Sequence, residues 1–220
     1  LKNTIFFFLL MITKKEIKKL WNNFWFLLWK DDSLKGWIFS IIIIFIFIKF
    51  IFFPGLSLVT GTALPLAIVE SCSMYHDGNL LSNYNDWWEE SKNKYNNFEI
   101  SKEEFEKFKM KNGLNKGDIL FITGTKPKNI EIGDIIIFNS GSKTPIIHRV
   151  INTNSNEGKF YFSTIGDNLK TNPKQLPIEK NIPEDQVMGK AQFKIAPYAG
   201  WIKLIFFENK KSSSNKGFCD

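Results

Sequence analysis

The chain has 220 residues, a length that allows one domain of ordinary size with appended segments. Its formal net charge is +7, but 28 of the 29 basic residues are lysine and Arg149 is the single arginine. Because this composition offers no arginine-rich patch to grip phosphates, we expect no nucleic-acid binding. The two cysteines, Cys72 and Cys219, do not make a disulfide framework, so the fold is expected to stand without covalent cross-links.

The N-terminal segment, residues 1–35, is basic and partly amphipathic and is predicted to be cytoplasmic. Its apolar run IFFFLLM (5–11) is too short to cross a bilayer, and Met11 is an alternative start that would make residues 1–10 a mis-assigned extension. The stretch KKEIKKLWNNFWFLLWK (14–30) predicts a helix on the inner membrane surface, with a shallow re-entrant segment as the alternative.

Residues 36–58 predict a single transmembrane helix. The run WIFSIIIIFIFIKFIFF carries one charge, Lys49, near its outer end, where a long side chain can reach the interface. Six lysines lie between residues 14 and 35, whereas residues 54–69 contain neither lysine nor arginine. The positive-inside rule therefore places the N-terminus in the cytoplasm and the rest of the chain outside the cell membrane. A buried core helix or central strand is the alternative for such a run.

Residues 59–207 predict an extracytoplasmic domain that is mainly β. Short runs rich in β-branched and aromatic residues are bounded by Gly, Asn, Asp or Pro, as is typical of antiparallel hairpins. These runs are 117–124, 133–141, 144–152 and 159–168. WIKLIFF (201–207) is expected to be a closing strand or an interfacial element, and the polar tail 208–220 is expected to be disordered.

A helical insertion, residues 83–111, interrupts the β pattern. Ser101 and Glu104 have the spacing of a capping box at the start of the run EEFEKFKM. Trp87 and Trp88 of the insertion have two interpretations, which are immersion in the lipid interface and packing on the domain.

The stretch IVESCSMYHDG (68–78) contains the candidate nucleophile, because Ser73 follows an apolar run and Ser71 lies two residues before it. A serine becomes a nucleophile at neutral pH only when a base takes its proton. The chain has two histidines that could do so, His76 and His148. His148 lies in the apolar run PIIHRVI, where a histidine is more often a satisfied buried residue than a catalyst. Asp167, in STIGDN, has two interpretations. Its carboxylate can accept a hydrogen bond from an imidazole and so fix the tautomer, or it can simply belong to a turn in which Gly and Asn supply the required backbone angles.

The order of these segments is more specific than any one of them. A membrane span is followed by LPLAIVESCSM, GDIIIF, IIHRVI and STIGDN. This series resembles type I signal peptidases, in particular the archaeal and endoplasmic-reticulum branch, in which histidine replaces the lysine base of the bacterial enzymes. The resemblance covers roughly residues 37–200 and implies a signal-peptidase-like β domain of short antiparallel strands.

The resemblance implies a role for each candidate residue. Ser73, directly before Met74, matches the nucleophile of the family. Ser71 matches the serine that can donate its hydroxyl to the oxyanion, with the backbone N–H of Ser73 as the other donor. His148 matches the general base, and Asp167 matches the acidic residue of the family's GDN motif.

Three departures from the family pattern affect these roles. Cys72 stands where the family usually has glycine, and this side chain either narrows the site or points away from it. His76 stands where proline is common, and it competes with His148 as a candidate base.

The third departure concerns the acidic member of the site. Eukaryotic relatives carry a further acidic residue shortly after the GDN motif, and residues 168–178 contain none. Asp167 is therefore expected to orient the base, unless Glu179 or Asp185 does so from farther along the chain.

These residues, with the resemblance, predict a membrane-bound serine endopeptidase that removes signal peptides from exported proteins through an acyl-enzyme intermediate. The expected partners are the signal peptides of secretory preproteins, membrane lipid and the protein-export channel, and we expect no metal or organic cofactor. The alternative is a catalytically degenerate β domain that binds extended peptides or an assembly partner. A third interpretation keeps proteolysis but dedicates it to one pilin-like or surface protein, selected by the insertion 83–111.

Overall fold

The computed structural model describes residues 13–78, 84–142, 144–208 and 216–219. The expectations for residues 1–10, for Met11 and for most of the polar tail lie outside these ranges. The chain divides into two compact units, residues 1–56 and 57–220, which are described one at a time.

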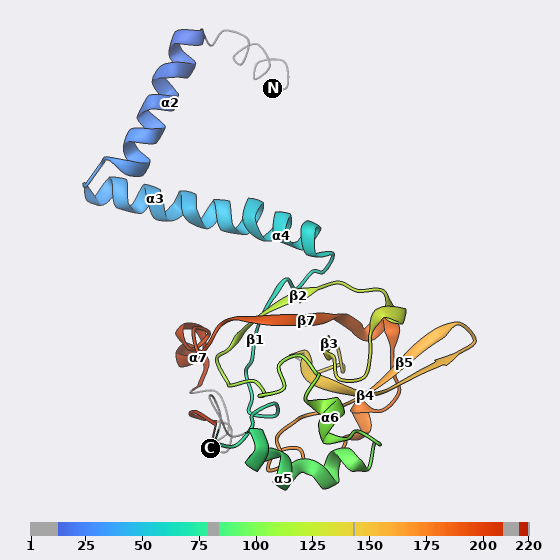
Figure 1. Cartoon of the computed structure of the whole chain (residues 1–220). Coiled ribbons are helices and arrows are strands. Elements are labelled where there is room, and N and C mark those ends of the chain that lie inside the picture. The colour runs from blue at the N-terminus through green and yellow to red at the C-terminus, as the bar shows by residue number, and fades with distance from the viewer. Residues whose placement is uncertain (1–12, 79–83, 143, 209–215, 220) are drawn as a thin grey trace. The chain divides into compact units, whose positions relative to one another are not determined.

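The described part of the N-terminal unit is helical and comprises four consecutive elements (Figure 1). They are α2 (Lys14–Trp29), α3 (Leu34–Phe47), the π-helical turn η1 (Ile48–Phe52) and the start of α4 (Phe53–Thr60). Helix α2 begins with a capping box, in which the Thr13 side chain accepts from the backbone N–H of Glu16 and the Glu16 carboxylate accepts from the backbone N–H of Thr13. The helix predicted from residue 14 is therefore present.

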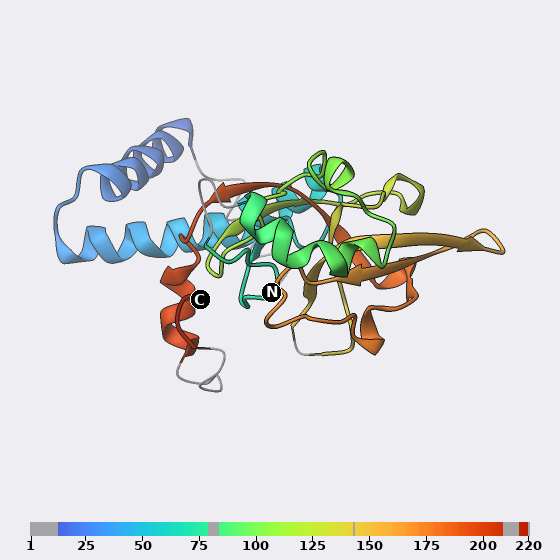
Figure 2. The ribbon, with the colours of Figure 1, turned by 60° about the horizontal axis from the view of Figure 1, so that its bottom comes forward.

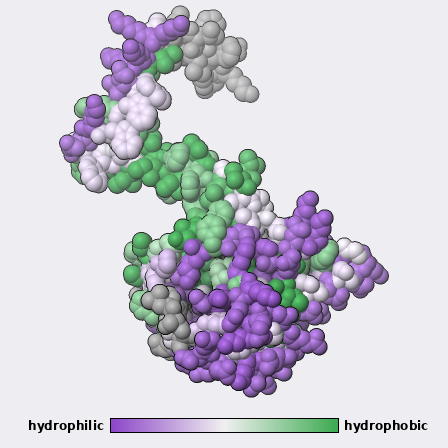
Figure 3. Space-filling view, viewed as in Figure 1, coloured by the Kyte–Doolittle hydropathy of each residue, from purple (hydrophilic) through white to green (hydrophobic). Residues whose placement is uncertain are grey.

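The α3, η1 and α4 elements form one continuous apolar helix, Leu34–Thr60, which contains the expected span 36–58. Its 27 residues rise about 40 Å, which exceeds the thickness of a bilayer core. By length and composition, this helix can cross a membrane, and its surface is strongly apolar in Figure 3. The π-helical turn ends two residues before Pro54, whose missing N–H and bulky ring disfavour the regular α-helical hydrogen bond.

The second unit is built on one antiparallel sheet of seven strands in the order β1-β2-β7-β3-β4-β5-β6. The strands are β1 (Leu66–Ile68), β2 (Ile119–Thr123), β3 (Ile135–Phe138), β4 (Ile146–Asn156), β5 (Lys159–Ile165), β6 (Ile182–Pro183) and β7 (Val187–Ala196). Each of the four runs predicted as strands overlaps one, and β4 continues beyond its predicted run 144–152 to Asn156. The mainly β class is therefore confirmed. The long β4–β5 hairpin projects beyond the rest of the sheet in both ribbon views (Figures 1 and 2).

The helical insertion is present as α5 (Tyr84–Asn96) and α6 (Lys102–Phe105), and the predicted capping box of Ser101 and Glu104 is formed. Trp87 and Trp88 are each 3% exposed, which supports packing on the domain rather than immersion in lipid. Their cluster joins the insertion to the sheet and contains Trp87, Trp88, Tyr95, Ile100, Phe105, Ile151 and Ile165.

Residues 201–207, expected as a closing strand or interfacial element, form a helix, α7 (Trp201–Glu208), so the strand prediction was wrong. Two side chains three residues apart explain the helix. The indole N–H of Trp201 donates to the Lys116 carbonyl at 3.0 Å, and Leu204 is fully buried. Ile202 and Phe206 remain exposed, so an interfacial position stays a prediction. The remaining short elements are the 3-10 helices η2 (Pro127–Asn129), η3 (Pro177–Glu179) and η4 (Glu184–Gln186).

A disulfide joins Cys72 to Cys219 across a sequence separation of 147 residues, with the two Cα atoms 5.5 Å apart. The expectation of a fold without covalent cross-links was therefore wrong. The described end of the tail, residues 216–219, is also held by other contacts. The Gly217 carbonyl accepts from the Lys116 ammonium at 2.8 Å, and the Phe218 ring centroid lies 4.5 Å from that of Trp201. For these four residues the structure differs from the disorder predicted for the tail.

Candidate active site

Strand β1 and the turn after it hold Ser73 beside the hydrophobic core. The pairing of β1 with β2 is extended by the Val69 N–H, which donates to the Asp118 carbonyl at 2.9 Å. Beyond the serine, Met74 is fully buried, and its carbonyl accepts from the Leu114 N–H at 2.7 Å. The backbone is thus held by hydrogen bonds on both sides of Ser73, while the Ser73 side chain remains partly exposed.

Ser71 lies beside Ser73, with their hydroxyl oxygens 3.1 Å apart. Either hydroxyl can donate in this contact, so the Ser71 hydroxyl is free to turn its hydrogen toward a developing negative charge. The pair predicted for attack and for oxyanion binding is therefore within hydrogen-bonding distance.

His148 lies on β4 opposite Ile136 of β3, and its side chain is almost fully buried. Its ring nitrogen Nδ1 contacts the carboxylate oxygen Oε1 of Glu179, which belongs to η3 and is fully buried. The other oxygen of Glu179 accepts from the backbone N–H of Leu176 at 2.6 Å, which fixes the carboxylate. This arrangement leaves Nε2 of His148 as the ring nitrogen that can accept a proton.

Ser73 and His148 line the same cleft, which has a volume of about 730 Å³. Its walls come mainly from two extended segments, 64–73 and 144–148, with Ile137 and Lys203. Strands β1 and β4 are separated by three strands in the sheet order, yet both reach this cleft, which shows that the sheet curls. Most lining residues are apolar, and the polar ones are Glu70, Ser71, Ser73, Thr144, His148 and Lys203.

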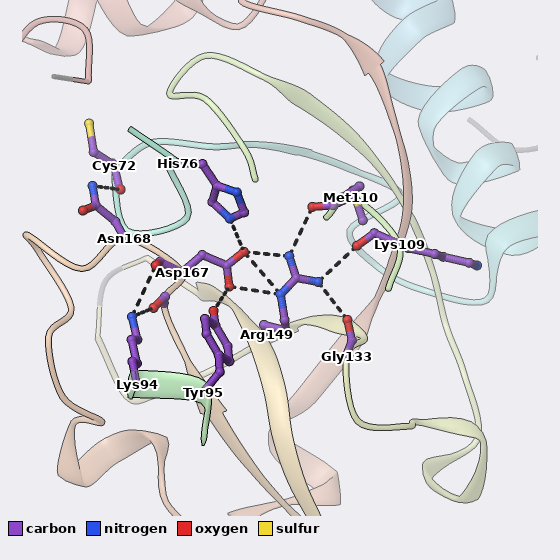
Figure 4. A network of polar contacts seen from close by, with 11 residues as sticks. Cys72, His76, Lys94, Tyr95, Lys109, Met110, Gly133, Arg149, Asp167 and Asn168 are labelled. Atoms are coloured by element: carbon purple, nitrogen blue, oxygen red, sulfur yellow. Dashed lines mark hydrogen bonds and ion pairs between the residues drawn. The ribbon is translucent and has the colours of Figure 1, made fainter. Parts of the chain in front are cut away.

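Asp167 is held by Arg149 and not by the imidazole of His148 (Figure 4). Its carboxylate accepts from Nε of Arg149 at 3.0 Å, from Nη2 at 2.6 Å and from the Tyr95 hydroxyl at 2.7 Å. Both members of the ion pair are fully buried. Burial alone would raise the pKa of Asp167, but the charge of Arg149 and hydrogen bonds from His76 and Arg149 outweigh it and hold this pKa well below its usual range.

Of the three carboxylates considered for the third position, Glu179 is the one that contacts His148. Asp167 occupies the ion pair just described, and Asp185 lies exposed on η4. The sequence left Glu179 as an alternative for this position but favoured Asp167, because Asp167 belongs to the family's GDN motif.

His76 is buried in the same network as Asp167. Its Nε2 atom lies 3.0 Å from the Asp167 carboxylate, and its ring stacks on Trp87 with centroids 3.5 Å apart. Burial lowers the pKa of His76, against the hydrogen bond to Asp167, which raises it. The imidazole is thus engaged with the acid and the indole, and His76 is not among the residues that line the cleft with Ser73.

The turn Gly166–Asp167–Asn168 touches the backbone of Ser73 directly. The Asn168 backbone N–H donates to the Ser73 carbonyl at 2.9 Å, and its side-chain amide donates to the Cys72 carbonyl at 2.9 Å. A Cβ atom built on Gly166 would lie 2.7 Å from the Ser73 carbonyl oxygen. Contact with residues 72–73 therefore requires glycine and asparagine in this turn. The local sequence of the turn does not reveal this requirement.

A stability experiment separates the structural role of Asp167 from catalysis. We expect Asp167→Asn to lower the free energy of unfolding by about 3–5 kcal/mol at neutral pH, because Arg149 loses its buried counter-ion. The difference from wild type should shrink as the pH falls below about 4, because the unfolded chain then binds a proton that the folded carboxylate, with its lowered pKa, still excludes. Denaturant titrations followed by tryptophan fluorescence at several pH values measure both effects.

The matched control for this substitution is Asp77→Asn. Asp77 forms an ion pair with Lys170 on the surface, where its side chain is 45% exposed. Exposed pairs contribute about 0–1 kcal/mol, so this variant should unfold almost as wild type does. Equal losses in the two variants would contradict a dominant role for the buried pair.

The chain is similar to catalytic subunits of the signal peptidase complex. It is 31% identical over 106 residues to the signal peptidase complex catalytic subunit SEC11C of Homo sapiens, a match that covers 46% of this chain and 55% of that protein. The SEC11 subunits of Yarrowia lipolytica and Candida tropicalis are 27% and 30% identical over 105 residues, which is 46% of this chain and 60% and 61% of those proteins. The chain thus spans little more than half the length of these relatives, and no family model matches it.

Among the residues that the structure describes, no cluster of three or more His, Cys, Asp or Glu side chains is arranged to hold a metal ion.

Proposed function

We propose that the chain is a membrane-anchored serine endopeptidase that removes signal peptides from exported proteins. The observation that carries the proposal is the cleft that Ser73 and His148 share, with Glu179 behind the imidazole. The similarity to signal peptidase catalytic subunits supports the same activity.

The proposed mechanism assigns one step to each group. Nε2 of His148 removes the proton from Ser73 as the serine oxygen attacks the scissile carbonyl, and Glu179 stabilises the resulting imidazolium. The Ser73 backbone N–H and the Ser71 hydroxyl donate to the oxyanion, an interaction worth about 3–4 kcal/mol per donor in comparable sites. His148 then protonates the leaving amine, and water hydrolyses the acyl-enzyme by the reverse sequence of proton transfers.

The cleft fits an extended peptide. β1 is the outermost strand of the sheet, and β4 pairs with β5 only from Arg149 onward, so residues 146–148 keep a free edge. A peptide strand can therefore form backbone hydrogen bonds along either wall, while the apolar lining accepts its side chains. Small residues one and three positions before the cut, as the resemblance implies, would fit shallow pockets in this lining.

The membrane anchor supports this choice of substrate. With the lysine-rich flank in the cytoplasm, the Leu34–Thr60 helix would deliver the β domain to the opposite face of the membrane. Signal peptides carry an apolar segment of their own, so enzyme and substrate would meet at one membrane surface at a raised effective concentration. Contact with membrane lipid and with an export channel belongs to this proposal.

A cleavage assay tests the proposal against the degenerate binding domain. The full chain, purified in detergent and reconstituted in liposomes, is incubated with a secretory preprotein, and the products are analysed by mass spectrometry. We expect one cut, at the end of the signal peptide, with a new N-terminus on the mature protein. A stable complex without any product would support the binding domain instead, and cuts at many unrelated sites would contradict signal-peptide removal.

A further inference from the structure

The insertion formed by α5 and α6 is anchored inside the β domain. Its aromatic side chains pack on Ile151 of β4 and Ile165 of β5, and the Trp87 ring stacks on His76, three residues after the candidate nucleophile. None of its described residues, 84–111, lines the cleft that contains Ser73 and His148. The described part of the insertion therefore contacts the segment after Ser73 through His76, at a place away from the lining of the cleft.

Two neighbouring residues at the end of α5 reach the turn 166–168 (Figure 4). The ammonium of Lys94, which is 6% exposed, donates to the Gly166 carbonyl and, at 3.3 Å, to the Asp167 carbonyl. The hydroxyl of Tyr95, which is fully buried, donates to the Asp167 carboxylate at 2.7 Å. Both the backbone and the side chain of this turn are thus held by the insertion.

The same turn holds the nucleophile from its other side. Asn168 donates to the carbonyls of Cys72 and Ser73, and the Ser73 carbonyl oxygen lies so close to Gly166 that a Cβ atom there would be only 2.7 Å from it. A continuous series of contacts therefore runs from α5, through residues 166–168, to the backbone that carries Ser73. Any shift of the turn changes the position of the Ser73 backbone N–H, the proposed oxyanion donor.

We propose that Lys94 and Tyr95 are positioning residues, which fix the nucleophile and the oxyanion donor by bracing the turn 166–168 from the insertion. This inference rests on the proposed function and deepens it. On this inference, the insertion affects the rate of the chemical step. An insertion that selects substrates would instead affect how tightly they bind. Displacements of about 1 Å in a reacting group can cost about a hundredfold in rate, so a brace of this kind has a measurable effect.

The test compares kcat and KM in two variants that keep the packing of the insertion. Tyr95→Phe removes only the hydroxyl, and Lys94→Met keeps the side-chain stem but removes the ammonium. With the full chain in liposomes and a preprotein substrate, we expect kcat to fall about tenfold to a hundredfold while KM stays within about twofold of wild type. The affinity of the same preprotein, measured with Ser73→Ala added to each variant, should not change.

Matched controls use the same chemical changes away from the turn. Lys92→Met removes an ammonium from the exposed face of α5, where Lys92 pairs with Glu89, and Tyr161→Phe removes a hydroxyl from β5 on the projecting hairpin. Both controls should retain the wild-type kcat. Thermal unfolding of each variant confirms that it is folded at the assay temperature, and Tyr95→Phe decides the question if Lys94→Met does not accumulate.

The possible outcomes test the positioning role separately from the proposed function. If wild type cleaves and Tyr95→Phe cleaves equally fast, the positioning role is overturned while the proposed function stands. If KM rises and kcat is unchanged, the insertion selects substrate and the positioning role is also overturned. If wild type does not cleave any preprotein, the proposed function fails, and the positioning role fails with it.

Discussion

Ser73→Ala should reduce the cleavage rate by at least about 10⁴-fold, because it removes the hydroxyl oxygen that we propose forms the acyl-enzyme. His148→Ala should cost a similar factor, since a serine hydroxyl without a base is a poor nucleophile at neutral pH. The losses should not add in the double variant, because the two residues act in one step. Initial rates of preprotein cleavage in liposomes, measured over long incubations, give these factors.

The matched control for the serine is Ser155→Ala. Ser155 is exposed on β4 within the projecting hairpin, away from the residues that line the cleft, and its replacement should leave the rate unchanged. Cleavage by Ser73→Ala at more than about a hundredth of the wild-type rate would show that another group attacks the peptide. The site built from Ser73 and His148 would then have to be abandoned.

The second large effect concerns the carboxylate behind the imidazole. Glu179→Gln should lower kcat by about 10³–10⁴-fold with little change in KM, because an amide can present its N–H₂ to Nδ1 and so favour the wrong imidazole tautomer. The acidic side chain also stabilises the imidazolium that forms as Ser73 attacks, and the amide cannot. Steady-state kinetics of the folded variant with a preprotein substrate measure the change.

Two further carboxylates provide the comparison. Asp185→Asn, at an exposed position of η4, should keep the wild-type kcat. Asp167→Asn should lose stability, as described above, and any folded fraction should still carry the His148–Glu179 contact. If Glu179→Gln kept kcat within tenfold of wild type while folded Asp167→Asn lost it, Asp167 and not Glu179 would be the third member of the site.

Local sequence patterns predicted the parts of this protein that depend on neighbours in the chain. Four β-branched runs each overlap a strand, the capping box of Ser101 and Glu104 is formed, and the long apolar run is helical. Ser71 and Ser73 are two residues apart, so a short motif sufficed to bring them together. These features need little information about the remainder of the fold.

The features that the sequence left open, or that were missed, depend on contacts between distant residues. Glu179 lies 31 residues from His148, on a short 3-10 turn that no periodic pattern marks. Residues 201–207 have the β propensity of a strand, but the burial of Leu204 and the hydrogen bond of Trp201 favour a helix. Cys72 and Cys219 are near opposite ends of the β domain in sequence, so only the folded chain shows that they meet.

The bridge between Cys72 and Cys219 also bears on which side of the membrane the domain occupies. Cytosolic glutathione and thioredoxin keep most thiols reduced, whereas structural disulfides persist in oxidising surroundings. The lysine-rich flank of the apolar helix independently predicts, by the positive-inside rule, that the domain lies outside the cytosol. The oxidation state of one cysteine pair in the cell would thus report the orientation of the whole chain, because the domain can keep this bridge only where reductants do not reach it.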